Sequence, residues 1–166
     1  MKFNVKYTSA RDIPTILEFL NPIIESRKYS AISDPLKADE LNDWIGEVSK
    51  TGITLTAVDT PDAKAIGIQF TERFTKYNDS LKHVAEIGTF VSLSHHGLGI
   101  GKKLFSRTVK LSKQLGYSKL IAIIRSDNPV AISFYKSIGF DVVGVLKKHV
   151  QIDKQFLDEI ICEKLI

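Results

Sequence analysis

Residues 90–105 read Phe-Val-Ser-Leu-Ser-His-His-Gly-Leu-Gly-Ile-Gly-Lys-Lys-Leu-Phe. The apolar segment that ends at Leu93 predicts a strand, and three glycines then follow at alternate positions, Gly97, Gly99 and Gly101. An amphipathic pattern starts directly at these glycines and predicts a long helix. Glycines let backbone N–H groups approach an anion closely, and a helix start adds free N–H donors and the positive end of the helix dipole. The stretch therefore predicts a loop that binds a pyrophosphate group.

The glycine spacing excludes two common phosphate-binding loops. A P-loop needs Gly-x-x-x-x-Gly-Lys-Ser/Thr, but the position five before Gly101 is His96, and no Ser or Thr follows Lys102. The dinucleotide fingerprint Gly-x-Gly-x-x-Gly also fails, because its third glycine position holds Lys102 or Leu104. The pattern that remains is His96-x-x-Gly99-x-Gly101 after a strand.

A second motif occupies residues 128–140, which read Asn-Pro-Val-Ala-Ile-Ser-Phe-Tyr-Lys-Ser-Ile-Gly-Phe. Asn128 and Pro129 are typical of a helix start, and Gly139 is typical of a helix end. This segment resembles the Asn-x-x-Ala-x-x-Phe-Tyr-x-x-x-Gly-Phe stretch found late in the GNAT superfamily of N-acetyltransferases. The first motif resembles the Arg/Gln-x-x-Gly-x-Gly/Ala loop of the same superfamily, with His96 in place of the usual Arg or Gln.

The resemblance implies a substrate, a fold and a set of contacts. The loop would bind the pyrophosphate of acetyl-coenzyme A, used as co-substrate without a metal. Two central strands, ending by position at Leu93 and Ile124, would splay apart around the pantetheine arm. The implied cofactor-binding residues are Phe90, Val91, Leu93, His96, Gly97, Gly99, Ile100, Gly101, Lys102, Asn128 and Tyr135.

Tyr135 is the candidate acid. Acetyl transfer to an amine requires a neutral amine, a donor for the oxyanion and a proton or donor for the departing thiolate. A phenol has a reference pKa of about 10, so it is protonated at neutral pH. The resemblance places Tyr135 against the thioester sulfur. The alternative is a core tyrosine beside Phe134.

Glu86 is the candidate base, because it interrupts an otherwise apolar or small segment, residues 84–91. This segment resembles the Val-Glu-x-Ser-Val-Tyr-Val stretch of phosphinothricin-type acetyltransferases, in which the glutamate deprotonates the amine. The alternative is a structural carboxylate paired with Lys82. No covalent nucleophile is evident in the sequence, which favours direct attack in a ternary complex.

The order of patterns predicts one mixed α/β domain over residues 1–166, in which residues 84–124 form a strand-helix-strand unit with a parallel crossover. The resemblance implies a mostly antiparallel mixed sheet with a splayed parallel pair and helices on both faces. A turn is expected at residues 59–62. The expected helices span residues 12–20, 34–48, 99–115 and 128–138, and the expected strands span residues 54–58, 65–70, 84–93, 120–124, 140–150 and 156–165.

Composition narrows the class of function. A single cysteine, Cys162, excludes an intrachain disulfide, and the four histidines show no metal-ligand spacing. No signal-peptide pattern and no membrane-spanning run is present, so we expect a cytoplasmic protein without a membrane partner. The net charge of +4 and the pI of about 9.1 raise nucleic-acid binding as an alternative. The basic residues form no stripe, so no nucleic-acid partner is expected.

The leading hypothesis is an N-acetyltransferase, and a non-catalytic acyl-coenzyme A sensor is the alternative. Glu86 and Tyr135 favour the enzyme, because a sensor needs neither an acid nor a base. The acceptor is expected to be a primary amine of a small molecule or peptide, bound near residues 30–33 and 75–78. The sequence does not determine the identity of this amine, nor whether the chain forms a homodimer.

Overall fold

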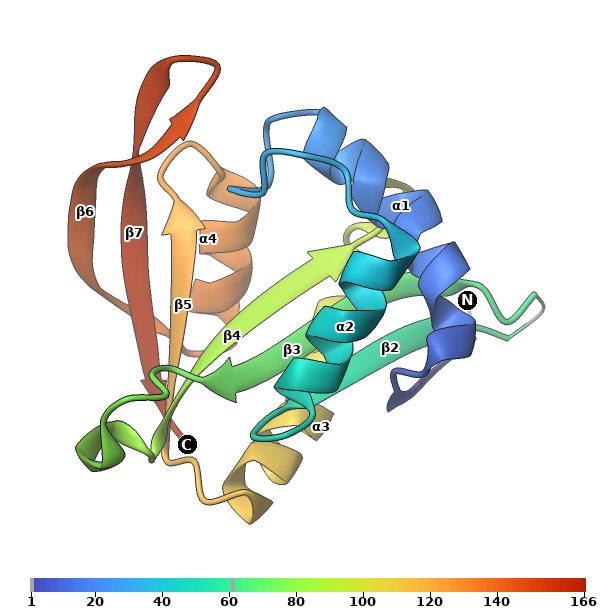
Figure 1. The fold of residues 1–166 in the computed structure, drawn as a ribbon, viewed down its shortest axis with the longest axis horizontal. Helices are drawn as coiled ribbons and strands as arrows, with labels where there is room; N and C mark the ends of the chain where they lie inside the picture. Colours follow the sequence, from blue (N-terminus) through green and yellow to red (C-terminus); the bar gives the residue numbers. More distant parts are fainter. Residues whose placement is uncertain (1, 61) are drawn as a thin grey trace.

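The computed structural model describes residues 2–60 and 62–166. These residues form one seven-stranded sheet with the order β1-β2-β3-β4-β5-β7-β6 (Figure 1). The strands are β1 (Phe3–Tyr7), β2 (Ile53–Asp59), β3 (Ala65–Arg73), β4 (Val84–Val91), β5 (Lys119–Arg125), β6 (Asp141–Ile152) and β7 (Gln155–Leu165). The helices are α1 (Ile13–Glu25), α2 (Ala38–Val48), α3 (Ile100–Gln114) and α4 (Pro129–Ser137). None of these helices is long and apolar enough to cross a membrane.

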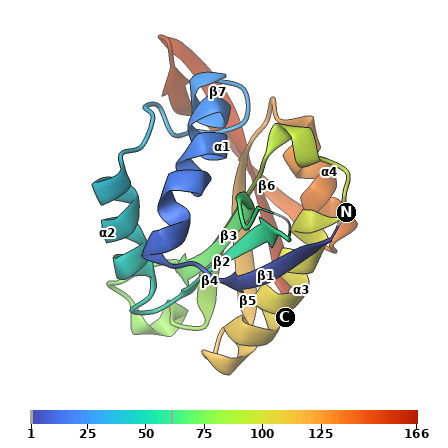
Figure 2. The same ribbon diagram turned by 90° about the vertical axis from the view of Figure 1, so that its right-hand side faces the viewer.

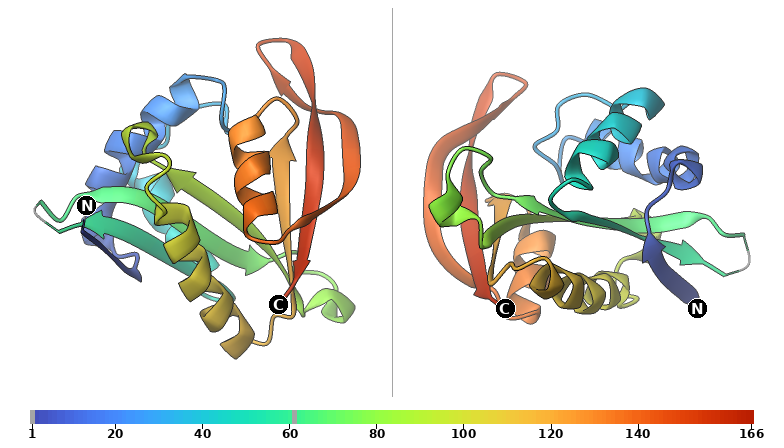
Figure 3. Two further views of the ribbon diagram at one scale, coloured as in Figure 1. Left: turned by 180° about the vertical axis from the view of Figure 1, so that it is seen from behind. Right: turned by 60° about the horizontal axis from the view of Figure 1, so that its bottom comes forward.

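The helices cover both faces of the sheet. Helices α1 and α2 lie on one face, and α3 and α4 lie on the other (Figures 2 and 3). On the first face, Ile16, Leu20 and Leu41 pack against Ile68 of β3. Burial of each large aliphatic side chain stabilises the fold by about 1.5–3 kcal/mol. The mixed sheet covered on both faces confirms the predicted fold class.

The β4–β5 pair is parallel, and all other strand pairs are antiparallel. Its pairing is short: Val84 to Glu86 lie opposite Lys119 to Ile121, whereas β3 and β4 stay paired as far as Val91. Figure 1 shows β4 and β5 diverging toward their carboxyl ends. The predicted splayed parallel pair is therefore present, and the divergence positions the site.

Several predicted boundaries were wrong for reasons that lie outside the local sequence. The second helix begins at Ala38 rather than Asp34, because the Asn21 side chain binds both the N–H and the carbonyl of Leu36 and holds the preceding segment extended. The strand expected to reach Leu93 ends at Val91, and a 3-10 turn follows it. Strand β1 was not predicted. Of the turn expected at residues 59–62, residue 61 lies outside the described part of the chain.

Candidate active site

Two cavities meet where β4 and β5 diverge. The first, here called the α1–α2 cavity, measures about 510 Å³ and lies among α1, α2 and strands β3 to β5. The second, the glycine-loop cavity, measures about 470 Å³ and lies among the end of β4, the start of α3 and helix α4. Five residues line both cavities: Tyr29, Thr89, Phe90, Ala131 and Tyr135. A molecule in one cavity would therefore meet a molecule in the other at these residues.

The three glycines of the loop are required for two different structural reasons. Gly97 and Gly99 both have φ of 79°, in the left-handed region, and a Cβ at either position would meet no atom within 4 Å. They are needed for backbone conformation rather than for space. Gly101 is needed for space, because its Cβ would lie 2.8 Å from the Phe134 ring. Together they start α3 at Ile100 and leave the first backbone N–H groups of the helix without intrahelical partners.

Nearly all of the predicted cofactor residues line the glycine-loop cavity. They are Phe90, Val91, Leu93, His96, Gly97, Gly99, Gly101, Lys102, Asn128 and Tyr135. Ile100 does not line it, because its side chain is 1% exposed and packs in the core between α3 and the sheet. Only the backbone of Ile100, at the helix start, is available to a ligand.

The polar side chains around this loop are partly committed to the protein. The His96 Nε2 atom donates to the carbonyl of Val91 at 3.1 Å, so the imidazole ties the loop to the end of β4. Lys103 donates to the carbonyl of Phe3 and Arg107 to that of Val5, both in β1. Among the basic residues of the first turns of α3, Lys102 is the one that lines the cavity.

Asn128 caps α4 as the sequence predicted. Its Oδ1 atom accepts a hydrogen bond from the N–H of Ala131 at 3.1 Å. Its Nδ2 atom donates to the carbonyl of Tyr29 at 3.2 Å, which connects α4 to the loop after α1. The same residue thus starts the helix that carries Tyr135 and lines the glycine-loop cavity.

Tyr135 is buried at the point of strand divergence. Its hydroxyl donates to the carbonyl of Ile87 at 3.3 Å, just beyond the last β4 residue that pairs with β5. The hydroxyl also lies 3.1 Å from Thr89 Oγ1, which accepts from Gln69 Nε2 at 2.8 Å. Because an amide N–H can only donate and a carbonyl can only accept, the chain of donors runs from Gln69 through Thr89 and Tyr135 to Ile87. Burial raises the pKa of Tyr135 well above its ordinary value, so the hydroxyl keeps its proton at neutral pH.

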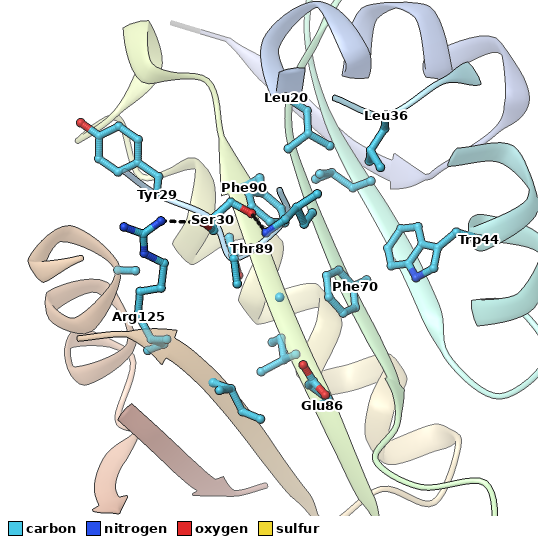
Figure 4. Close-up of a pocket in the computed structure, with 18 of the residues that line it drawn as sticks. Leu20, Tyr29, Ser30, Leu36, Trp44, Phe70, Glu86, Thr89, Phe90 and Arg125 are labelled. Atoms are coloured by element: carbon cyan, nitrogen blue, oxygen red, sulfur yellow. Dashed lines mark hydrogen bonds between the residues drawn. The ribbon is translucent and has the colours of Figure 1, made fainter. Parts of the chain in front are cut away.

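Glu86 lines the α1–α2 cavity from β4 (Figure 4). Within the described chain its side chain makes no hydrogen bond or ion pair. The alternative role, a structural ion pair with Lys82, is therefore not observed. Burial raises the pKa of Glu86, and the nearby carboxylates of Glu72 and Glu159 raise it further. Glu72 lies directly opposite Glu86 on β3. This shift moves the pKa of Glu86 toward the range in which a general base works near neutral pH.

Sequence reasoning missed Arg125, which lines the α1–α2 cavity and holds the loop that carries Tyr29. Its Nη1 atom donates to the carbonyl of Arg27 at 2.7 Å and to that of Ser30 at 2.8 Å (the latter in Figure 4), and so fixes the loop after α1 to the end of β5. Its Nε and Nη2 atoms donate to the carboxylate of Asp127. The available signal was an arginine that directly follows the apolar run of residues 120–124.

The loop after α1 lines the α1–α2 cavity as expected, through Ser30, Ala31 and Ile32. None of residues 75–78 lines either cavity, so their expected contact with the acceptor stays a prediction. The aromatic pair Trp44 and Phe70, in edge-to-face contact at 4.9 Å, forms part of the wall instead (Figure 4). Among the described residues, no group of three or more His, Cys, Asp or Glu side chains is arranged to hold a metal ion.

Residues 25–140 match the sequence model of the acetyltransferase (GNAT) family, a span that contains both motifs. The chain belongs to this family of acetyltransferases. The Bacillus subtilis protein YwnH is 22% identical over 150 residues, which cover 89% of this chain and 90% of that protein. An L-amino acid N-acyltransferase of Escherichia coli, MnaT, is 33% identical over 66 residues, 40% of this chain and 38% of that enzyme.

Solved structures share the fold. A phosphinothricin acetyltransferase of the GNAT superfamily from Sinorhizobium meliloti superimposes with a TM-score of 0.90 at 21% identity, covering 100% of this chain and 89% of that one. That crystal structure contains acetyl-coenzyme A. The likeness extends over the whole sheet and its helices.

Proposed function

We propose that this acetyltransferase moves an acetyl group from acetyl-coenzyme A to a primary amine of a small molecule or peptide, by direct attack in a ternary complex. The observation that carries the proposal is the pair of cavities that share a wall at Tyr135 and Thr89. The glycine-loop cavity would take the pyrophosphate and pantetheine arm, and the α1–α2 cavity would take the amine. The thioester would then lie at the shared wall, within reach of both.

Glu86 is the proposed base, acting directly or through a bound water. It lies on the amine side of the shared wall, its carboxylate is unpaired in the described chain, and its raised pKa favours proton uptake. An ammonium must lose a proton before its nitrogen can attack a carbonyl carbon. The Glu159 carboxylate, which lines the same cavity, would hold the ammonium nearby before that step.

Tyr135 is the proposed donor to the departing thiolate. Its hydroxyl reaches the shared wall, and its raised pKa keeps it protonated. When charge develops on the sulfur, the hydroxyl would exchange its bond to the Ile87 carbonyl for one to the sulfur. The backbone N–H groups at the start of α3, together with Lys102, are the proposed partners of the pyrophosphate.

The test combines binding and turnover. Calorimetry should show acetyl-coenzyme A binding to the purified protein, and a panel of primary amines should then give amine-dependent release of coenzyme A thiol. Glu86→Gln should keep the binding and lose most of the turnover at neutral pH. Binding without thiol release for every class of amine would support the sensor alternative instead, and absence of binding would overturn the proposal.

A further inference from the structure

The charges that line the α1–α2 cavity are unbalanced. Three carboxylates line it, those of Glu40, Glu86 and Glu159. Arg125 is the only basic residue among the described residues that line it. The type of acceptor therefore depends on whether Arg125 can bind a negatively charged group.

Arg125 is already committed to the protein. Four of its five N–H groups donate within the chain, two to the Arg27 and Ser30 carbonyls and two to Asp127. The residue is 5% exposed, and the Asp127 carboxylate already balances its charge. A carboxylate on the acceptor would gain at most one hydrogen bond, from the second N–H of Nη2, and would have to displace Asp127 to form a bidentate pair.

Two of the three cavity carboxylates, those of Glu86 and Glu159, are free to meet a cation, whereas Glu40 is paired with Lys37. Glu159 is 6% exposed, and within the described chain its one charged contact is His149 Nε2 at 3.8 Å, with no hydrogen bond. Glu86 has no partner among the described residues. Burial raises the pKa of both groups, and for Glu159 it outweighs the opposing effect of His149 and Arg125. A bound ammonium would compensate their charges, whereas a second carboxylate would add to the repulsion.

The walls toward α1, α2 and β3 are apolar. Trp44 and Phe70 form an aromatic pair on one side, and aliphatic side chains from α1, α2 and β3 complete the surface. These aliphatic residues are Leu20, Leu36, Leu41 and Ile68. A volume of about 510 Å³ lies within the range of cavities that enclose small organic ligands.

We infer that the acceptor is a hydrophobic primary amine without a carboxylate, such as an arylalkylamine, rather than an amino acid. The inference rests on the proposed function and specifies its acceptor. Its basis is a cavity that is apolar toward α1 and α2, two unpaired carboxylates and one guanidinium whose charge Asp127 already balances. It distinguishes this chain from MnaT, whose name assigns it L-amino acids.

Matched pairs of acceptors test the inference. Phenethylamine and phenylalanine, and tryptamine and tryptophan, differ by one carboxylate. Phenylalaninamide provides a neutral control for the added group. Rates are compared as kcat/KM per unprotonated amine, to remove differences in amine pKa. Juxtaposed like charges cost several kcal/mol, so the amine should exceed its amino acid by about 100-fold or more, and phenylalaninamide should lie near the amine.

Two variants test the source of the discrimination. Glu159→Gln removes a buried carboxylate, so the preference for tryptamine over tryptophan should fall by about 5- to 10-fold. Glu40→Gln is the matched control, because this side chain is exposed and its charge is screened by solvent. It should leave the preference unchanged.

The outcomes separate the inference from the proposed function. Equal or better turnover of the amino acids overturns the inference while the transferase remains. Loss of preference in Glu40→Gln but not in Glu159→Gln also overturns it. Absence of turnover for both members of every pair, with acetyl-coenzyme A bound, overturns the proposed function and the inference together.

Discussion

At the scale of single residues, Tyr135 combines a structural and a chemical role. Its hydroxyl replaces the missing β5 partner of Ile87, so it stabilises the divergence that creates the site. The same hydroxyl receives a hydrogen bond from Thr89, which is held by the buried Gln69. A phenol that accepts one bond and donates another has a fixed orientation. Donation to a thiolate would require the bond to Ile87 to be exchanged for one to sulfur.

Tyr135→Phe tests this double role. We expect kcat to fall by about 10- to 100-fold with little change in the Kd of acetyl-coenzyme A, because only the hydroxyl is removed. Stability should also fall, by about 1–3 kcal/mol, because the Ile87 carbonyl loses a buried donor. Steady-state kinetics and urea unfolding measure the two effects. A stability loss with unaltered kcat would assign Tyr135 to structure alone.

Glu86→Gln tests the proposed base through pH. The variant keeps the shape of the side chain but cannot accept the proton of the ammonium. We expect kcat/KM for the amine to fall most near neutral pH and to recover toward wild type at alkaline pH, where the free amine is already deprotonated. Profiles from about pH 6 to 10 measure this. A constant ratio between the two proteins across the range would mean that Glu86 positions the acceptor without deprotonating it.

At the scale of elements, the loop before α3 depends on backbone conformation at Gly99. Its φ of 79° exposes the first N–H groups of the helix toward the glycine-loop cavity. Gly116, at the other end of the same helix, has φ of 90°, and a Cβ there would also meet no atom within 4 Å. The two glycines thus have similar steric surroundings, but only Gly99 lines the cavity.

Gly99→Asp and Gly116→Asp form a matched pair. Both place a carboxylate at a left-handed position, so both should lose about 1–2 kcal/mol of stability. Only Gly99→Asp puts negative charge where the pyrophosphate is proposed to bind, and we expect its Kd for acetyl-coenzyme A to rise by about 10-fold or more. Calorimetry measures both variants. Equal affinities would contradict the placement of the pyrophosphate.

The elements that local chemistry determines could be predicted from the sequence, and those that depend on distant contacts could not. The α4 start follows from Asn128 and Pro129, which act within one turn. Strand β1 is short and partly polar, and it is stabilised by β2 and by Arg107, about a hundred residues away. Likewise, the register of β5 with β7 brings Glu159 opposite Arg125, and no local sequence pattern predicts that pairing.

At the scale of the whole molecule, the site reduces the stability of the fold that carries it. Glu72, Glu86 and Glu159 lie on three strands of one sheet, and burial raises the pKa of each. The carboxyl of Asp12, outside this cavity, has the opposite shift: hydrogen bonds to Lys6 and Ser9 outweigh its burial and lower its pKa. Uncompensated charge is therefore concentrated around the α1–α2 cavity, as expected where function opposes stability.

The destabilisation of the fold by the Glu86 carboxylate should depend on pH. A carboxyl with a raised folded pKa binds its proton more tightly in the native state. Its ionisation therefore destabilises the fold progressively as pH rises from the unfolded pKa, about 4.3, through the folded value. Glu86→Gln cannot ionise, so without ligand its Tm should match wild type near pH 4 and exceed it by roughly 1–3 °C at pH 7–8.

Asp43→Asn is the control, because it removes one carboxylate at an exposed position within α2, where solvent screens the charge. We expect no pH-dependent difference for it. Thermal unfolding of the three proteins, followed by circular dichroism between about pH 4 and 8, measures the effect. A variant that is less stable than wild type at neutral pH would mean that ionised Glu86 is compensated within the protein. That result would remove the unpaired carboxylate on which both the base and the recognition of a cationic acceptor depend.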